Sequence, residues 1–342
     1  MRIKRWQFNK GYKFVAIGGG TGLPVLLKGL KQHTSNITAI VNVADDGGSS
    51  GVIKNEFDIL PPGDIRNCLL ALAENEGKIK ELFDYRFCRG KELAGHNLGN
   101  LLLAGMSDLK GDFYSAVQEF EKILAVRGKV LPSTLSKVTL NAETSSGMVI
   151  QGQTGINETE EKIESVFLIP KKPDPSPGVI EAILAADVVV LGPGSLFTSV
   201  LPNLLVGAVK EALRKTSAKI FYVCNIMTEP GETGGYDASD HYCALSKHLG
   251  HGVIDSIVVN NEKVPESLRA KYGEGLVSPV LYNANRLKKL GLEVVEASLV
   301  DKGKYIRHDP IRLSQAILGN GCVSDNDIVE YFYISKKKRN FD

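Results

Sequence analysis

The feature that most constrains the fold is a short apolar run, Phe14–Ile17, that ends in a glycine-rich turn. Between Leu23 and Leu30, leucines then recur at the spacing of one helix face, and a second apolar run follows at Ile37–Val43. A strand, a glycine turn, a helix and a second strand make a βαβ unit, which closes with parallel strands and a right-handed crossover. The sequence therefore predicts an α/β fold that begins near the N-terminus.

The rest of the chain favours the same fold class, with one change of period. Apolar stripes at helical spacing run through residues 61–126. Between residues 130 and 170, apolar and polar side chains alternate around Ser145-Ser146-Gly147, which is typical of a β-hairpin, and a proline-rich stretch follows. Four later segments resemble strands separated by helices: Asp187–Leu191, Ile220–Val223, Ile257–Asn260 and Val294–Ala297.

These patterns predict a Rossmann-like, doubly wound and mostly parallel sheet with a small β-hairpin insertion. We expect a single α/β domain over residues 13–320, in which 130–170 form a β-rich insertion and linker. Residues 1–12 and 335–342 are expected to be basic tails, the second because of its Lys336–Arg339 run.

Composition limits the class of protein. Lys plus Arg number 41 against 39 Asp plus Glu, so a net charge of +2 gives no strong positive field, and we expect no nucleic-acid partner. No apolar run approaches the ~18 residues of a membrane span, so we expect none. The cysteines are odd in number and include no CxxC motif, which favours reduced thiols in a cytoplasmic protein. A homodimer is expected, because most soluble oligomers are two-fold.

The first glycine loop lies where a doubly wound sheet binds phosphate. Gly19, Gly20, Thr21 and Gly22 permit close backbone approach, and the N-terminus of the following helix adds a partial positive charge. The loop departs from the dinucleotide fingerprint, because Leu23 stands where a third glycine would be. The alternative is a tight structural turn.

Two adjacent carboxylates, Asp45 and Asp46, follow the second predicted strand. Dinucleotide-binding folds place an acid there, about 20 residues beyond the glycine turn, to accept a ribose hydroxyl. The second carboxylate could hold Mg²⁺, and Gly47 and Ser49 belong to the same candidate loop. The alternative is an Asx turn with both carboxylates in solvent.

Two further polar turns each enter an apolar helix. In the first, Asp64 is a candidate N-cap, and Arg66 and Asn67 lie in the first helical turn. The positive end of the helix dipole disfavours an arginine there, so Arg66 is a candidate for binding an anion such as phosphate. A local ion pair between Arg66 and Asp64 is the alternative. The second turn holds His96, Asn97 and Asn100. Its histidine could serve as an acid or a phosphate donor, or simply as a capping or core residue.

A second glycine loop follows the predicted strand at Asp187–Leu191 and supplies Gly192, Gly194 and Ser195. It repeats the geometry of the first loop, so both could face one ligand at a topological switch point of the sheet. No GxSxG nucleophile elbow is present. Asn225 adds a polar side chain at the end of the next strand.

In their order along the chain, these loops resemble those of the CofD-like proteins, and within that family the YvcK branch of bacterial gluconeogenesis factors. The likeness spans residues 13–320. It is carried by these segments: Gly18–Gly22, Val43–Gly51, Pro61–Asn67, His96–Asn100, Leu191–Leu196, Cys224–Thr228 and Arg307–Pro310.

The resemblance implies a cytoplasmic protein with a Rossmann-like fold and a nucleotide ligand. For the YvcK branch it implies binding of UDP-sugars such as UDP-N-acetylglucosamine, and a role in cell shape and wall-precursor metabolism on gluconeogenic carbon sources, with no established reaction. It also implies that Tyr272 and Arg307 contact the nucleotide sugar. The CofD branch is instead a Mg²⁺-using transferase that moves a phospholactyl group to a deazaflavin. Its loop carries a further acid where this chain has Gly47-Gly48-Ser49-Ser50.

Two functions remain open, and a third is disfavoured. Phosphate-binding loops without a nucleophile, base and orienter set favour a regulatory protein that binds a nucleotide sugar. The paired carboxylates instead favour a transferase of the 2-phospho-L-lactate type, with Mg²⁺ on Asp45 or Asp46 and Arg66 stabilising the diphosphate. An NAD-dependent dehydrogenase is disfavoured, because the third glycine is missing.

Overall fold

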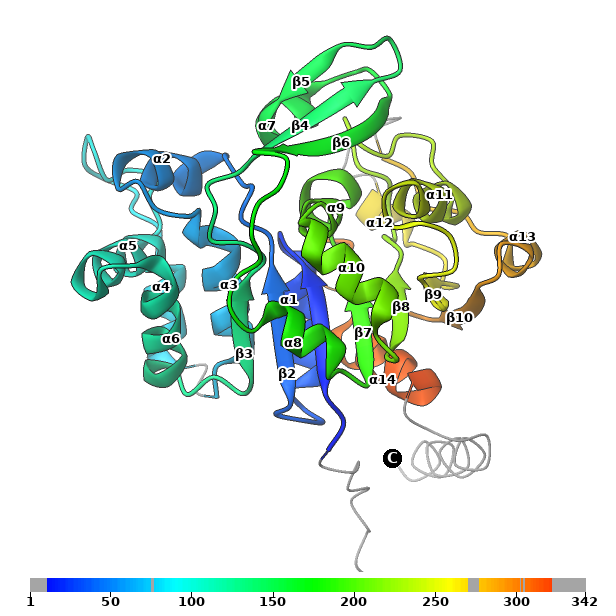
Figure 1. Cartoon of the computed structure of the whole chain (residues 1–342), viewed down its shortest axis with the longest axis horizontal. Coiled ribbons are helices and arrows are strands. Elements are labelled where there is room, and N and C mark those ends of the chain that lie inside the picture. The colour runs from blue at the N-terminus through cyan, green and yellow to red at the C-terminus, as the bar shows by residue number, and fades with distance from the viewer. Residues whose placement is uncertain (1–10, 75–76, 270–276, 302, 304, 322–342) are drawn as a thin grey trace, which may run out of the picture.

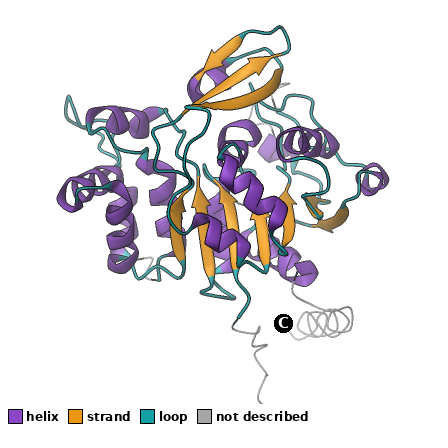
Figure 2. Cartoon of the chain, in the orientation of Figure 1, coloured by secondary structure: helices purple, strands orange, loops and turns teal. Residues whose placement is uncertain are grey.

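Seven parallel strands form the central sheet, in the order β10-β9-β8-β7-β1-β2-β3 (Figures 1 and 2). The computed structural model describes residues 11–321, apart from 75–76, 270–276, 302 and 304. The strands of this sheet are β1 (Phe14–Gly18), β2 (Ile37–Val41), β3 (Lys129–Pro132), β7 (Val188–Leu191), β8 (Lys219–Val223), β9 (Ser256–Asn260) and β10 (Glu293–Ala297).

Helices cover both faces of the sheet, which explains why its central strands read as continuous apolar runs. Every residue of β1 and of β7 is buried. The helices are α1 (Gly22–Leu30), α2 (Gly48–Glu56), α3 (Pro62–Leu72), α4 (Lys78–Asp84), α5 (Leu98–Lys110), α6 (Phe113–Ile123), α7 (Gly152–Glu158), α8 (Val179–Leu184), a π-helix η1 (Leu196–Val200), α9 (Leu201–Leu204), α10 (Gly207–Lys215), α11 (Ala238–Leu249), α12 (Glu266–Arg269), α13 (Ala284–Lys289) and α14 (Pro310–Gly321).

The helices pack in groups around the sheet. Helices α8 and α10 pack together in front of the sheet in Figure 1, and α1 packs against α3 and α14. Helices α2, α4, α5 and α6 lie at the β3 side of the molecule, at the left of Figure 1. Helices α3, α4, α5 and α6 account for the helical pattern predicted for residues 61–126.

The sheet reverses its direction of growth between β1 and β7. From β1 the chain adds β2 and then β3 on one side, and it later returns to place β7 on the other side of β1 before adding β8, β9 and β10. All of these pairs are parallel, so the predicted doubly wound sheet is confirmed. The topological switch point lies at the carboxyl ends of β1 and β7, where such folds bind ligands.

A separate antiparallel sheet, in the order β5-β4-β6, stands above the carboxyl edge of the main sheet in Figure 1. Strands β4 (Thr139–Thr144) and β5 (Val149–Gln151) form the predicted hairpin, and β6 (Ile163–Ile169) adds a third strand. Helix α7 packs on β4 and β5.

Two boundaries differ from the sequence prediction. Residues 130–132, assigned to the insertion, belong to β3, whose Val130 pairs with Ala39 in the main sheet, so the insertion begins after Pro132. A short run of alternating residues looks the same on the edge of either sheet, so its period could not decide between them. The predicted loop after β2 becomes helix α2 from Gly48, although its glycines and serines are typical of turns.

Within the described residues, no single helix is long and apolar enough to cross a membrane. One pair of helical segments in the described part of the chain, Leu196–Leu204 and Gly207–Lys215, passes that test when taken together, and the two are bent by 77°. Residues 1–10, the basic tail predicted at 335–342, and Tyr272 lie outside the described residues.

Candidate functional site

The two glycine loops touch each other at the switch point. A Cβ placed on Gly22 would overlap the carbonyl oxygen of Pro193 and lie 2.9 Å from the backbone nitrogen of Gly194. A Cβ on Gly194 would lie 3.2 Å from the carbonyl oxygen of Gly19. Side chains are therefore excluded where the loop after β1 meets the loop after β7, and glycine allows the two backbones to pack directly.

A cavity of about 390 Å³ opens beside these loops. Its walls come from the ends of β1, β7 and β8 and from the chain that leads into α14. Predicted ligand residues that line it are Gly20, Thr21, Gly22, Gly194, Ser195, Asn225 and Arg307. These residues meet because the carboxyl ends of parallel strands lie at one edge of the sheet.

A second cavity, of about 210 Å³, shares Thr21, Val25 and Arg307 with the first. It extends toward α3, where Asn67 lines it. Arg307 therefore borders both cavities. The Arg307 side chain is exposed, with its guanidinium carbon 5.8 Å from the centre of the Tyr305 ring, and its carbonyl accepts a 2.8 Å hydrogen bond from the Asp301 backbone.

Helix α1 begins at the first cavity without a side-chain cap. Thr21 occupies the N-cap position but makes no capping hydrogen bond, and Gly22 is the first helical residue. The first backbone N–H groups of a helix have no partner within the helix, and they carry the positive end of its dipole. This end of α1 therefore suits an anionic ligand group such as phosphate.

Asp64 is not the N-cap that the sequence predicted. Helix α3 begins at Pro62, with Pro61 at the cap position, because proline is favoured in the first helical turn. The Asp64 carboxylate instead accepts a 2.6 Å hydrogen bond from the backbone N–H of Gly20. Burial raises the pKa of Asp64 to about 6. Asp64 thus connects α3 to the first glycine loop.

The raised pKa of Asp64 predicts a pH dependence of stability. The folded protein binds the proton of the Asp64 carboxyl more tightly than the unfolded chain does. The free energy of unfolding that Asp64 contributes is therefore lost as pH rises from about 4 to about 6. Asp64→Asn removes this dependence. We expect the free energy of unfolding of the variant, relative to wild type, to increase by about 3 kcal/mol across that interval.

Urea unfolding at several pH values between 3.5 and 7 measures this difference. Asp108→Asn, at an exposed position of α5, is the matched control. Parallel pH curves for wild type and Asp64→Asn would show that Asp64 titrates normally and would contradict the prediction.

Arg66 is engaged with neighbouring amides rather than with an acid. Its Nη1 and Nη2 donate to the Oδ1 atoms of Asn100 and Asn67, each over 2.7 Å. It makes no ion pair with Asp64 in the described structure, so the local pair considered from the sequence does not form. The side chain is 8% exposed, and its Nε has no hydrogen-bond partner.

The turn before α5 joins α2 in a polar cluster around Ser49, here called the Ser49 cluster: Ser49, Arg66, His96, Asn97 and Asn100. Ser49 Oγ lies 3.3 Å from His96 Nδ1 and accepts from the backbone of Asn97 and the amide of Asn100. Asn97 is the N-cap of α5, because its side chain accepts from the Asn100 backbone over 3.1 Å. The capping role weighed for this turn therefore belongs to Asn97 rather than His96.

The two adjacent aspartates face different partners. Asp46 accepts hydrogen bonds of 3.0 to 3.1 Å from the backbone of Gln153 and from both the backbone and hydroxyl of Thr154, so it caps α7 of the insertion. Asp45 accepts from the backbone of Gly47 over 3.0 Å, which is the Asx turn considered above, and burial raises its pKa.

Mg²⁺ at Asp45 and Asp46 stays a prediction. Among the described residues, no group of three or more His, Cys, Asp or Glu side chains could hold a metal ion. Both oxygens of Asp46 are already used by α7. Asp45 and Asp46 therefore do not form a metal site by themselves.

Replacing Asp46 with alanine tests its role at α7. The change removes all three hydrogen bonds at the start of that helix, and loss of an N-cap costs about 1 to 2 kcal/mol. We expect faster amide hydrogen exchange in α7 and a loss of unfolding free energy of that size. Glu143→Ala, at an exposed position of β4, is the control. Unchanged exchange in α7 would contradict this role.

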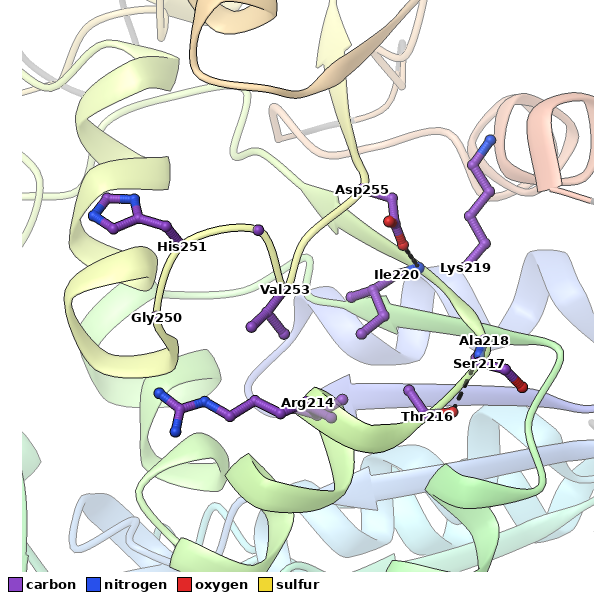
Figure 3. Close-up of a pocket in the computed structure, with 12 residues that line it drawn as sticks. Arg214, Thr216, Ser217, Ala218, Lys219, Ile220, Gly250, His251, Val253 and Asp255 are labelled. Atoms are coloured by element: carbon purple, nitrogen blue, oxygen red, sulfur yellow. Dashed lines mark hydrogen bonds between the residues drawn. The ribbon is translucent and has the colours of Figure 1, made fainter.

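A larger hollow, of about 730 Å³, lies at the opposite edge of the sheet (Figure 3). It surrounds the start of β8 and the turn before β9, and two of its charged side chains have protein partners. Arg214 Nε donates to the carbonyl of Leu249 over 2.8 Å, and Asp255 accepts from the backbone of Ile220 over 2.7 Å. Ligands of doubly wound sheets bind at the carboxyl edge, so we assign the site to the smaller cavity.

Sequence reasoning missed two residues of the site, Glu229 and His308, which both line the first cavity. Their only sequence signal was their position, close to Asn225 and Arg307. His308 Nε2 lies 3.2 Å from the carbonyl oxygen of Cys224, and burial lowers the pKa of His308 to about 4. Burial also raises the pKa of the Cys224 thiol to about 12. Neither group is charged near neutral pH, so neither is an activated acid or nucleophile.

The fold and the site define a doubly wound α/β protein with two glycine loops and an arginine around one cavity. The family described as 2-phospho-L-lactate transferase CofD matches residues 14–300. The chain belongs to the CofD family, as the resemblance predicted.

Its relatives lie in the gluconeogenesis-factor branch. The chain is 49% identical over 307 residues to the gluconeogenesis factor of Bacillus subtilis, covering 90% of this chain and 97% of the relative. It is 48% identical to that of Halalkalibacterium halodurans, covering 89% and 95% of the two chains. A crystal structure of a Bacillus halodurans protein superimposes with a TM-score of 0.87 at 48% identity, covering 90% and 99% of the two chains.

Proposed function

We propose that this protein is a regulatory protein that binds a nucleotide sugar of the UDP-N-acetylglucosamine type. One observation carries the proposal: the cavity at the switch point combines two touching glycine loops, the uncapped start of α1 and Arg307. Its volume of about 390 Å³ falls within the usual range for small-molecule sites, roughly 300 to 1,000 Å³.

The chemistry of the walls suggests how the ligand lies. Backbone N–H groups at Thr21, Gly22 and Gly194 suit the diphosphate, together with the Arg307 guanidinium. Asn225 and Ser195 offer polar side chains to the rest of the ligand. Tyr272 is kept as a proposed contact from the family resemblance. Val277, the first described residue beyond 270–276, lines the cavity.

The remaining predicted residues form a second group around the first glycine loop. Asp64 reaches that loop directly, and the Ser49 cluster continues from Arg66 in the same helix α3. We propose that this group supports the loop and borders the ligand site. It contains Gly19, Asp45, Asp46, Gly47, Ser49, Asp64, Arg66, Asn67, His96, Asn97 and Asn100, while Gly192 supports the second loop.

The biological role proposed is regulation of cell shape and wall-precursor metabolism during growth on gluconeogenic carbon sources. It rests on the family resemblance and on relatives named gluconeogenesis factor. In this proposal the protein is a cytoplasmic homodimer built from one CofD-like domain over residues 13–320. Its response would follow occupancy of the cavity rather than turnover of the ligand.

Isothermal titration calorimetry with UDP-N-acetylglucosamine, UDP-glucose and UDP-galactose tests the binding proposal. We expect micromolar dissociation constants for at least one UDP-sugar, and intact ligand after prolonged incubation. Absence of measurable affinity for all three would overturn the proposal.

A Mg²⁺-dependent transferase is the second candidate, because the family that matches the chain is described as a 2-phospho-L-lactate transferase. The enzyme would act on a nucleotide diphosphate conjugate, with Arg66 near the leaving diphosphate. Release of nucleotide from such a conjugate with Mg²⁺ and an acceptor would favour this candidate. Binding without release would favour the regulatory protein.

A further inference from the structure

A pair of buried acids lies where the chain leaves β8. Glu229 lines the first cavity, and Glu232 follows one turn later with only 6% of its surface exposed. The turn between them is held by its own hydrogen bonds. The carbonyl of Glu229 accepts from the backbone of Thr233 over 2.9 Å, and the Thr233 hydroxyl accepts from the backbone of Glu229 over 2.9 Å. The two carboxyls therefore lie on one hydrogen-bonded turn.

The two acids have different partners. Glu232 accepts from the backbone of Phe197 over 2.9 Å and from the hydroxyl of Thr198 over 2.6 Å, so it holds the π-helix that follows the second glycine loop. Glu229 accepts from the Asn225 amide over 3.3 Å and is hydrogen-bonded by the Ser195 hydroxyl, and all three side chains belong to the cavity wall.

Charge sets what Glu229 can bind. Burial raises the pKa of both carboxyls, and the neighbouring Glu229 raises that of Glu232 further, to about 7, so the pair carries less than two full negative charges near neutral pH. An ionised carboxylate accepts hydrogen bonds and donates none. It repels phosphate, so it must face a part of the ligand that carries hydrogen-bond donors.

In such folds, the acidic residue that accepts hydrogen bonds from ribose hydroxyls usually follows the second strand. In this chain that position is held by Asp45 and Asp46. Asp46 is used at the start of α7, Asp45 is used in its own turn, and neither lines the first cavity. Among the residues that the structure describes, Glu229 is the acid that lines it.

We propose that Glu229 is the specificity-determining residue that accepts hydrogen bonds from a vicinal hydroxyl pair of the ligand's sugar. The inference rests on the proposed nucleotide-binding function, which it deepens. Asn225 and Ser195 orient the carboxylate, and the glycine loops hold the phosphates away from it. The hydroxyl pair belongs either to the ribose or to the attached hexose, and a panel of ligands separates these two sources.

The experiment measures dissociation constants of wild type and Glu229→Gln for UDP-N-acetylglucosamine, UDP and 2′-deoxy-UDP. Glu229→Gln keeps the size of the side chain but weakens a charge-assisted acceptor, so we expect an affinity loss of about 10-fold for the ligand that carries the hydroxyl pair. For the ligand that lacks this pair, wild type and variant should bind equally. Glu160→Gln, an exposed acid outside the cavity, is the matched control.

The pattern of losses decides the outcome. A loss for UDP but not for 2′-deoxy-UDP assigns the pair to ribose, and a loss for UDP-N-acetylglucosamine but not for UDP assigns it to the hexose. Equal losses for all three ligands, or none, would overturn the inference, because a merely structural role cannot distinguish ligands. Thermal melting confirms that the variant is folded.

The two proposals fail separately. If wild type binds none of the UDP compounds, the proposed function fails. The role of Glu229 is then tested with ADP, GDP and their 2′-deoxy forms, by comparing the dissociation constants of wild type and Glu229→Gln for each ligand. Absence of binding to every nucleotide overturns both. Wild-type binding of UDP-sugars with an unchanged Glu229→Gln profile overturns only the role of Glu229.

Discussion

Replacing Gly22 with alanine will lower the affinity for UDP-N-acetylglucosamine about 100-fold or more. The new Cβ would overlap the carbonyl oxygen of Pro193, which is backbone and cannot rotate away, so the two glycine loops must separate. Both loops line the cavity, on the side where the proposed ligand places its phosphates. Loss of two charge-assisted hydrogen bonds, at about 1.5 kcal/mol or more each, accounts for this factor. The strained contact will also lower the unfolding free energy by about 1 to 3 kcal/mol.

Gly105→Ala in α5 is the matched control, because a Cβ there meets no atom within 4 Å. It should leave binding unchanged and raise stability by about 1 kcal/mol, since alanine is favoured over glycine within helices. Calorimetric titration and urea unfolding of both variants give the two quantities. Wild-type affinity in a folded Gly22→Ala protein would place the phosphates away from the glycine loops.

Arg307→Ala is expected to lower the affinity for UDP-N-acetylglucosamine by about 10- to 150-fold. Arg307 borders both cavities, and in the proposed binding mode its removal deletes a charge-assisted bond to the diphosphate worth roughly 1.5 to 3 kcal/mol. Because the side chain is exposed, the unfolding free energy should change by less than about 1 kcal/mol.

Arg127→Ala serves as the control for charge. Arg127 pairs with Glu74 over 2.9 Å and lines neither cavity, so its loss should affect binding and stability only slightly. Titrations at matched salt compare the three proteins. Equal dissociation constants for wild type and Arg307→Ala would remove Arg307 from the site.

Much of the site could be predicted from the sequence because of one geometric rule. Gly20, Ser195 and Asn225 each follow a predicted parallel strand, and parallel strands end at a common edge. The order of the apolar runs therefore predicted that these three residues would meet, although Gly20 lies far from Ser195 and Asn225 in the sequence.

The partners of the charged residues could not be predicted in this way. Asp64 was expected to cap its own helix, but it bonds to Gly20, 44 residues away. Asp46 was expected at the ligand, but it caps α7 more than 100 residues later in the chain. A carboxylate accepts from whichever donors the packing brings within about 3 Å, and that competition is absent from local sequence.

By itself, the sequence determined most of the elements, the doubly wound class of the sheet and the family, because the period of apolar residues and the glycine loops are local signals in the chain. Only the tertiary structure decided that β3 joins the main sheet, that α7 rests on Asp46, and that Glu229 enters the cavity beside Arg307. These outcomes depend on contacts between segments distant in the chain. Their free energies come from burial and hydrogen-bond geometry, which exist only after the layers have packed.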